Sequence, residues 1–288
     1  MGIDTEAGGD IPERVLERIC QAERIYLFLD YDGTLADFAP TPDTIEVDMK
    51  LVRLLDRLAK NPRLRIAVVS GRRLKHIRDL LPVPGILLAG TYGIELVTAA
   101  GEQVEREAYS AVRPVLEALK PRWEALIAGR EGFYLEDKGW ALAIHARMAE
   151  DRLAAQVLAE ARQTAEELQA APSPVKTSFR LLGGHKFQEI GPGVADKGQS
   201  VEYILEHYPF PDSLPVFFGD DDKDERAFAV IKSRGGVAGV VASEPRQTLA
   251  DFRLPSPASL RAWLEEVFLQ AGEGCREEGE ISDIEVDR

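Results

Sequence analysis

Short apolar runs alternate with longer amphipathic segments along most of the chain. Several of these runs are short and apolar enough to be buried strands, and they lie at residues 25–29 (IYLFL), 65–69 (RIAVV), 86–89, 215–218 (PVFF) and 237–241. The segments between them follow helical periodicity, at residues 47–60, 73–81, 199–207 and 225–231. Strands that alternate with helices in this way predict an α/β fold, with a mostly parallel sheet that carries helices on both faces.

The middle of the chain has a different pattern. Two long amphipathic stretches, at about residues 107–126 and at residues 151–170, are accompanied by short strand-like runs at residues 133–135, 141–145, 179–182 and 187–190. We therefore expect a doubly wound, Rossmann-like core domain at residues 1–102 and 189–270, with an α/β cap domain inserted at residues 103–188. Residues 271–288 hold seven acidic and two basic residues, so we expect an acidic, disordered tail there.

The balance of charge restricts the possible partners. The formal net charge is -14, which leaves no general positive field to attract nucleic acid or an anionic membrane. No apolar run is long enough to span a bilayer, and the N-terminus is acidic, unlike a signal peptide. We expect a cytoplasmic protein with no nucleic-acid or membrane partner; the oligomeric state stays open.

Two aspartates directly follow the predicted strand at residues 25–29. One residue separates Asp30 from Asp32, and Gly33 allows a turn after them. Ligands of open α/β sheets bind at the carboxyl ends of the strands. Two neighbouring carboxylates repel and need a cation or a shared proton, and Mg²⁺ suits this donor set. A bare Asp-x-Asp is also a common polar end of a strand, capped by an Asx turn.

Two further positions could bind an anion. Ser70 and Gly71 end the run at residues 65–69, where a hydroxyl and free backbone N–H groups suit a phosphate oxygen, although the same residues also cap helices. Lys197 opens the predicted helix at residues 199–207, where the helix dipole disfavours a cation. An exposed surface lysine is the alternative for that position.

An acidic segment follows the run at residues 215–218. It includes Asp220, Asp221 and Asp224, and so much like charge at one strand end is costly unless a metal compensates it. A solvated acidic loop is the alternative for any one of these residues.

With these residues in this order, the chain resembles the haloacid dehalogenase superfamily, whose motifs match residues 30–35, Ser70, Lys197 and residues 219–224. The resemblance implies a phosphatase in which Asp30 attacks phosphorus and forms an aspartyl-phosphate. Asp32 would act as acid and base, which favours an ester phosphatase because the dehalogenases of the superfamily lack this residue. Ser70 and Lys197 would hold the phosphoryl oxygens.

The resemblance also implies a metal site. Mg²⁺ would be held by Asp30, the backbone carbonyl of Asp32, and Asp220, with Asp221 or Asp224 bound through water.

Within the superfamily the chain is similar to the trehalose-6-phosphate phosphatase family. The residues that carry this likeness are Glu-Asp-Lys-Gly at 136–139, His145-Ala146-Arg147, Glu189 ahead of Lys197, and the acidic motif at 219–228. The resemblance implies Mg²⁺-dependent hydrolysis of trehalose 6-phosphate to trehalose and phosphate, a step of trehalose biosynthesis. The substrate-binding residues would be Ser70, Gly71, Arg72, Glu136, Lys138, Glu189 and Lys197. Arg72 either reaches the substrate or caps the site.

Two positions depart from the pattern of that family. Tyr92 stands in Gly90-Thr91-Tyr92-Gly93, where histidine is usual, and Lys223 replaces a threonine. Phosphatases of sucrose phosphate, mannosyl-3-phosphoglycerate or glucosylglycerol phosphate therefore stay open as alternatives. A phosphomutase or an inactive regulatory domain is a more distant alternative, which the large cap and the intact acid/base carboxylate argue against.

Overall fold

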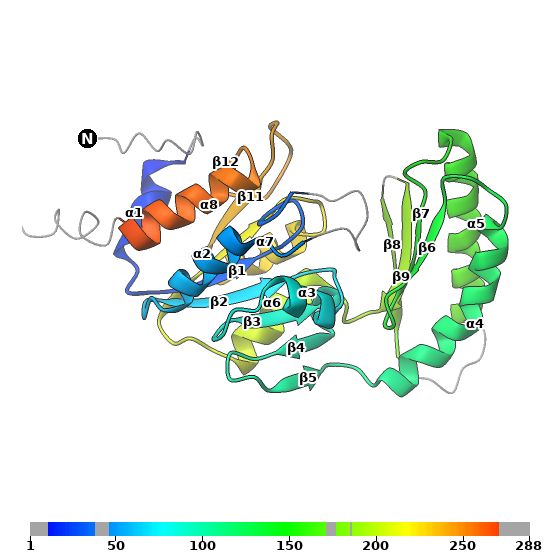
Figure 1. The fold of residues 1–288 in the computed structure, drawn as a ribbon, viewed down its shortest axis with the longest axis horizontal. Helices are drawn as coiled ribbons and strands as arrows, with labels where there is room; N and C mark the ends of the chain where they lie inside the picture. Colours follow the sequence, from blue (N-terminus) through cyan, green and yellow to red (C-terminus); the bar gives the residue numbers. More distant parts are fainter. Residues whose placement is uncertain (1–10, 38–45, 171–176, 185, 271–288) are drawn as a thin grey trace, which may run out of the picture.

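The computed structural model describes residues 11–37, 46–170, 177–184 and 186–270 (Figure 1). Within them lie an eight-stranded sheet and a four-stranded sheet, each with its own helices. The tail expected at residues 271–288 falls outside the described residues. Among the described helices, none combines the length and the apolar character that crossing a membrane would require.

The large sheet has the topology that the alternation of strands and helices predicts. Its strands, in spatial order, are β12 (Phe252–Leu254), β11 (Val237–Val241), β10 (Ser213–Gly219), β1 (Arg24–Leu29), β2 (Leu64–Val69), β3 (Leu87–Gly90), β4 (Glu95–Val97) and β5 (Gln103–Glu105). Neighbours from β12 to β3 are parallel, and β3, β4 and β5 form antiparallel pairs. The chain leaves β1 toward β2 on one side and returns to β10 on the other, so the carboxyl ends of β1, β2 and β10 meet at the point where the strand order switches.

The central strands are apolar along their length, and successive side chains of a strand point to opposite sides. Both faces of the large sheet are therefore apolar. On one face Ile25, Leu27 and Leu29 of β1 belong to a core cluster shared with α1 (Glu13–Gln21), α2 (Met49–Ala59), α3 (Leu74–Leu80), α8 (Pro257–Glu265) and η3 (Glu266–Gln270). On the other face Tyr26 and Phe28 pack with α6 (Lys197–His207) and α7 (Glu225–Ser233). The sheet is therefore covered on both sides, as predicted.

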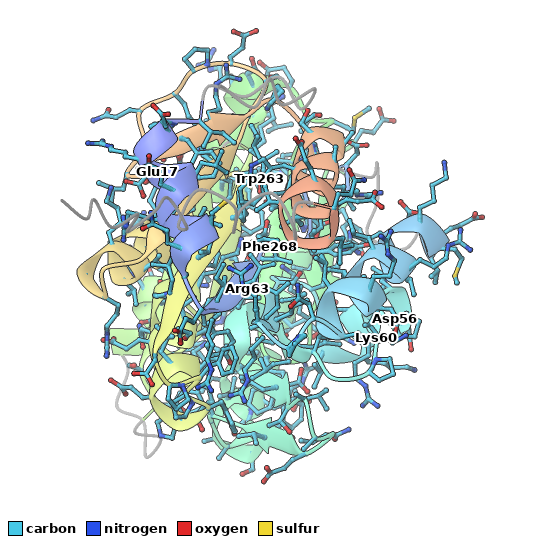
Figure 2. All side chains as sticks on the ribbon, turned by 90° about the vertical axis from the view of Figure 1, so that its left-hand side faces the viewer. Glu17, Asp56, Lys60, Arg63, Trp263 and Phe268 are labelled. Atoms are coloured by element: carbon cyan, nitrogen blue, oxygen red, sulfur yellow. The ribbon has the colours of Figure 1, made fainter. Side chains whose placement is uncertain are left out.

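Helix α8 covers one side of this core. Trp263 is fully buried, and its ring lies 5.3 Å from that of Phe218 and 5.7 Å from that of Phe268. Figure 2 shows Trp263 and Phe268 beside α8, whereas Asp56 and Lys60 lie on the outer side of α2. The large aromatic side chains thus fill the space between the sheet and its helices. The ion pair of Lys60 with Asp56 stays in solvent.

The small sheet is entirely antiparallel. Its spatial order is β6 (Tyr134–Asp137), β7 (Leu142–His145), β9 (Phe187–Pro192) and β8 (Phe179–Gly184). Two long helices, α4 (Tyr109–Ile127) and α5 (Asp151–Ala170), cover the side that faces away from the large sheet (Figure 1). The indole N–H of Trp123 donates to the carbonyl of Ala161 at 3.0 Å and joins the two helices.

Both boundaries of the inserted unit differ from those expected from the sequence. Residues 103–105 form β5, which pairs with β4 in the large sheet, because a short hairpin keeps them there before α4 begins. Residues 189–192 continue β9 of the small sheet, because the pairing with β8 extends to Pro192. The inserted unit thus runs from α4 to the end of β9, not over residues 103–188. We keep the name cap for this unit.

Candidate active site

The predicted phosphoryl-transfer residues lie together at the carboxyl edge of the large sheet. Asp30 follows β1 and is 3% exposed, and its backbone N–H still donates to Phe218 of β10 at 2.9 Å. Ser70 follows β2 and is fully buried. Gly33 adopts a φ of 82°, which turns the chain directly after Asp32. Residues that are 40 positions apart in the sequence are brought to one edge because parallel strands end on the same side.

Lys197 lies at the amino end of α6, as predicted, and is not a surface lysine. Its ammonium is 2.8 Å from Asp30 Oδ1 and 2.6 Å from Asp224 Oδ1, and the residue is 4% exposed. Burial acts to lower the pKa of Lys197, but Asp224 and Asp30 outweigh it and hold the pKa well above its usual value. These carboxylates explain how a cation is tolerated where the helix dipole opposes it.

The acidic loop after β10 is folded around Asp224. This residue is fully buried, and its Oδ2 accepts the backbone N–H groups of Asp220 and Asp221, each at 3.1 Å. A side chain at position 219 would place its Cβ 2.3 Å from Asp224 Cγ, so only glycine allows this close approach. The buried side chain of Asp224 therefore holds this loop in a defined conformation.

The carboxylates at this edge fit a divalent cation. Asp30, Asp220 and Asp224 each offer an oxygen within 4.8 Å of the others. Burial, together with the charge of Asp30, raises the pKa of Asp220 to about 9. Burial also raises the pKa of Asp224 to about 8, against the opposing effect of Lys197. Oxygen donors that repel one another in this way are the ligands that hard divalent cations prefer.

Asp221 and Asp32, which were expected to bind the metal through water and through a backbone carbonyl respectively, do not add a carboxylate to this cluster. The side chain of Asp221 faces Lys223, with 3.6 Å between carboxylate and ammonium. Burial opposes ionisation of Asp221, but Lys197 and Lys223 prevail and lower its pKa. The carboxylate of Asp32 is held by Arg72, whose Nε and Nη2 donate to its two oxygens at 2.7 and 2.6 Å.

This contact of Arg72 was not predicted. From the sequence we expected Arg72 either to bind the substrate or to cap the site. In the structure its guanidinium forms a bidentate ion pair with the carboxylate of Asp32. The guanidinium thereby orients the side chain that the sequence predicts as the acid and base.

The cap presents a second polar cluster. Lys138 is 8% exposed and donates to Glu189 at 2.7 Å, and Glu136 lies 3.8 Å away on the same side. Burial alone would lower the pKa of Lys138, but Glu189 more than offsets it and the pKa is raised. Glu136 also contacts His145 Nε2 at 2.9 Å, which links β6 to β7 on this side of the cap sheet.

Three residues lie close together between the sheet edge and the cap in a way that the sequence did not predict. Arg180 on β8 places its guanidinium 5.0 Å from the ring centre of Tyr92, and Lys223 lies 5.9 Å from the same ring. Tyr92 and Lys223 stood out in the sequence only as departures from a family pattern. Arg180 carried no signal, since one arginine on a short strand is unremarkable in a sequence.

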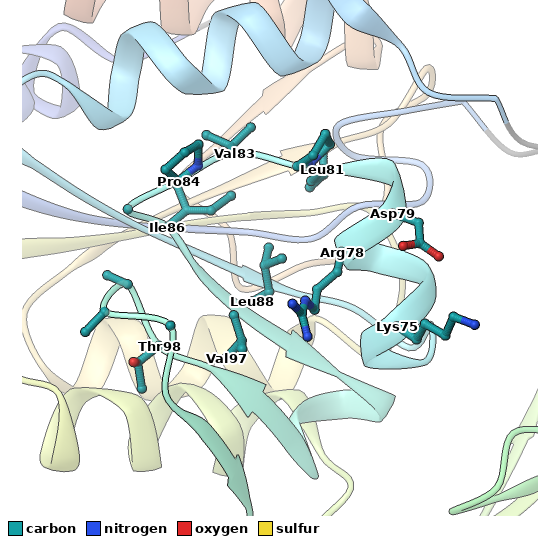
Figure 3. A pocket seen from close by; sticks show the side chains of 15 residues that line it. Lys75, Arg78, Asp79, Leu81, Val83, Pro84, Ile86, Leu88, Val97 and Thr98 are labelled. Carbon is teal, nitrogen blue, oxygen red and sulfur yellow. The ribbon is translucent and has the colours of Figure 1, made fainter.

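A cavity of about 620 Å³ lies elsewhere, at the amino end of β3 (Figure 3). It is lined by residues 81–86, by Leu88 and by residues 97–101, with Lys75, Arg78 and Asp79 of α3 at its rim. None of the predicted site residues lines it. Because it lies at the opposite end of the strands, it has no part in the candidate active site.

The fold and this edge place the chain among α/β proteins of the haloacid dehalogenase type. Comparison with known proteins then narrows the class. The family model of trehalose-phosphatase matches residues 28–258, and the chain belongs to this family.

Individual relatives carry the same description. The chain is 32% identical over 253 residues to the trehalose-phosphate phosphatase of Mycobacterium tuberculosis (strain ATCC 25618 / H37Rv), covering 86% of this chain and 62% of that protein. It is 31% identical over 260 residues to that of Mycobacterium avium (strain 104), covering 86% and 63%. The chain thus spans somewhat less than two thirds of these relatives. Among solved structures, the C-terminal domain of trehalose-6-phosphate phosphatase from C. albicans shares the fold, with a TM-score of 0.76, 21% identity and coverage of 91% and 98%.

Proposed function

We propose that the chain is a Mg²⁺-dependent phosphatase that hydrolyses trehalose 6-phosphate to trehalose and phosphate. The observation that carries the proposal is the convergence of Asp30, Asp32, Ser70 and Lys197 at one sheet edge, faced by the polar cluster of the cap. A phosphoryl group at this edge and a sugar toward the cap would use both clusters at once. Membership of the trehalose-phosphatase family supports the choice of sugar.

The reaction proceeds in two displacements. A carboxylate oxygen of Asp30 attacks phosphorus, the bond from phosphorus to the sugar oxygen breaks, and Asp32 gives that oxygen its proton. Asp32 then takes a proton from water, whose oxygen attacks the aspartyl-phosphate and releases phosphate while Asp30 is regenerated. The buried ammonium of Lys197, 2.8 Å from Asp30, offsets the negative charge that develops on the phosphoryl oxygens.

Asp30, Asp220 and Asp224 would hold the Mg²⁺ ion, since their oxygens already lie within 4.8 Å of one another. The bound ion supplies charge stabilisation for the phosphoryl oxygens. The hydroxyl of Thr34 lies 3.2 Å from Asp30 Oδ2 and 3.3 Å from Asp220 Oδ1, so its one proton is shared between these two carboxylates and keeps them turned toward each other.

On the sugar side, Lys138 and Glu189 supply a donor and an acceptor for hydroxyl groups, and both are buried. A pair that is shielded from water discriminates among sugars, because any hydroxyl that is absent leaves a buried polar group without a partner. Exposed residues would not impose this penalty.

The test is a panel of sugar phosphates with the purified protein and Mg²⁺, measured as release of inorganic phosphate. We expect kcat/KM for trehalose 6-phosphate to exceed that for sucrose 6-phosphate and glucose 6-phosphate by at least about tenfold. A clear preference for another sugar phosphate would reject the substrate and keep the phosphatase. No phosphate release from any phosphomonoester would reject the enzyme itself.

A further inference from the structure

The turn that follows β3 has an unusual backbone. Thr91, Tyr92 and Gly93 have φ angles of 49°, 54° and 82°, so three successive residues lie in the left-handed region, two of them not glycine. Such a conformation is unfavourable for residues with a Cβ and persists where the surrounding structure enforces it. Residues in this state are concentrated at functional positions, so the side chain that the turn presents is of interest.

The structure enforces this turn from both sides. The N–H of Tyr92 donates to the carbonyl of Ser70 at 2.8 Å, and the hydroxyl of Ser200 donates to the carbonyl of Tyr92. Arg106 donates to the carbonyl of Gly93 at 3.0 Å and to Ser200 Oγ at 2.8 Å. The position of Tyr92 is therefore fixed by contacts with β2, with α6 and with the segment after β5.

The ring of Tyr92 lies at the catalytic edge. It packs on Gly71, where an added Cβ would come within 2.8 Å of the ring, and the residue is 4% exposed. Gly71 directly follows Ser70, so the ring lies beside the predicted phosphoryl site.

Cation–π contacts join the core and the cap. The cap supplies cations to a ring of the core, and the core supplies a cation to a ring of the cap. From the cap, Arg180 and Lys138 lie over the ring of Tyr92, at 5.0 and 5.8 Å from its centre. From the core, Lys223 lies 4.8 Å from the ring centre of Phe187 on β9, and 5.9 Å from that of Tyr92. We call these five residues the clasp. Cation–π contacts are strongest where water is excluded, as around the buried ring of Tyr92.

We propose that Tyr92 and Lys223 are positioning residues that hold the cap over the catalytic edge while a sugar phosphate is bound. The inference rests on the proposed function. Lys138 is the link, because it contacts the ring of Tyr92 and also donates to Glu189 in the predicted sugar site. The clasp thereby keeps the sugar-binding pair in register with Asp30. The two residues that depart from the family pattern thus lie side by side, with the Lys223 ammonium 5.9 Å from the ring centre of Tyr92.

The clasp acts on the equilibrium between open and closed arrangements of the cap. If the closed state binds the sugar, a smaller closed fraction raises the apparent dissociation constant in proportion. A phosphate ester without a sugar loses less, since it has no partner in the cap. The expected signature of a lost clasp is a higher KM for sugar phosphates with a smaller change in kcat.

The experiment compares Tyr92→Leu, Lys223→Met and the double variant, with trehalose 6-phosphate and p-nitrophenyl phosphate as substrates. Each single variant is expected to raise KM for the sugar phosphate by about three- to thirtyfold, the range expected for losing one or two cation–π contacts. The double variant is expected to lose less than the product of the two single effects, because both residues act on one closure. The conservative Tyr92→Phe and Lys223→Arg keep a ring and a cation and should recover most of the loss.

Lys232→Met is the matched control, since Lys232 is a half-exposed lysine that pairs with Asp251 far from the cap. Equal losses for both substrates, or no rise in KM for the sugar phosphate, would overturn the clasp. Small-angle X-ray scattering tests the clasp without relying on the proposed enzymatic activity. If the wild type hydrolyses no sugar phosphate, a larger radius of gyration in the double variant, but not in the control, still supports the clasp. An unchanged radius overturns it.

Discussion

Replacing Asp220 by asparagine should make the metal-free protein more stable while it destroys the metal site. Asp220 is the member of the acidic cluster with the fewest favourable contacts: its side chain accepts one hydrogen bond, from Thr34, and within the described residues no lysine or arginine forms an ion pair with it. An amide oxygen can accept the same bond. The substitution therefore removes a charge and leaves the local structure in place.

The magnitude follows from the spacing of the carboxylates. The oxygens of the cluster lie within 4.8 Å of one another, and at that upper limit two unit charges repel by about 3.5 kcal/mol at an effective dielectric constant of about 20. Asp220 meets both Asp30 and Asp224 at this range, and Lys197 compensates part of the charge. Uptake of protons relieves a further part, since the pKa of Asp220 is raised to about 9. We expect a net gain of about 1–3 kcal/mol in the free energy of unfolding, and a Tm higher by about 2–10 °C.

The assay is urea unfolding of EDTA-treated wild type and Asp220→Asn at a slightly alkaline pH, with and without MgCl₂. Mg²⁺ should stabilise the wild type by mass action and the variant much less. Asp222→Asn is the matched control: it lies on the same loop, its side chain is 96% exposed, and it should change stability by less than about 0.5 kcal/mol.

Two results would refute this reasoning. A variant less stable than the wild type in EDTA would mean that the carboxylates do not repel as their spacing requires. Equal stabilisation of both proteins by Mg²⁺ would mean that Asp220 is not a ligand.

Three further predictions concern the same edge. Asp30→Asn should lower kcat for any phosphate ester by at least about a thousandfold, measured as phosphate release, and retained activity would exclude Asp30 as the nucleophile. Lys197→Met leaves Asp224 buried without its cation, so the unfolding free energy without metal should fall by about 3–5 kcal/mol in urea titrations, and a fall below about 1 kcal/mol would contradict the buried pairing. The pKa of Asp220 is raised from 3.8 to about 9, and that of Asp224 from 3.8 to about 8. Their contribution to stability is therefore fully present below about pH 4 and is lost as the pH rises to about 8 and 9. Thermal unfolding in EDTA should accordingly show stability falling from weakly acidic to alkaline pH, and Mg²⁺ should flatten the profile; stability that rises with pH in EDTA would disprove it.

The elements with strong periodicity could be predicted from the sequence. The second long amphipathic stretch of the middle region and the strand predicted at residues 237–241 coincide with α5 and β11. The missed strands β4, β5 and β12 are three residues long, too short for alternation to be recognised. The start of α8 did carry a readable signal: Ser256 caps it by accepting the N–H of Ser259 at 3.1 Å, and Pro257 follows at the first helical position.

The candidate site divides in the same way. Asp30 and Ser70 directly follow apolar runs and Asp220 stands one residue beyond another, so the rule for parallel strands was enough to bring them together. The grip of Arg72 on Asp32 and the contacts of Arg180 depend on how segments far apart in the sequence pack, and no local pattern encodes them. Glu189 was found only through a motif, because a single glutamate on a strand has no chemical signature of its own.

One helix explains why position 92 could change without disturbing the catalytic edge. Lys197 and Ser200 lie three residues apart on α6, so the first turn of that helix serves both the acidic cluster and the carbonyl of Tyr92. A side chain at position 93 would place its Cβ 2.1 Å from Ser200 Oγ, so glycine there is what lets the helix approach. These contacts hold the backbone of the turn and not the ring. A different side chain at position 92 therefore alters what faces the cap, while Lys197 and the carboxylates keep their places.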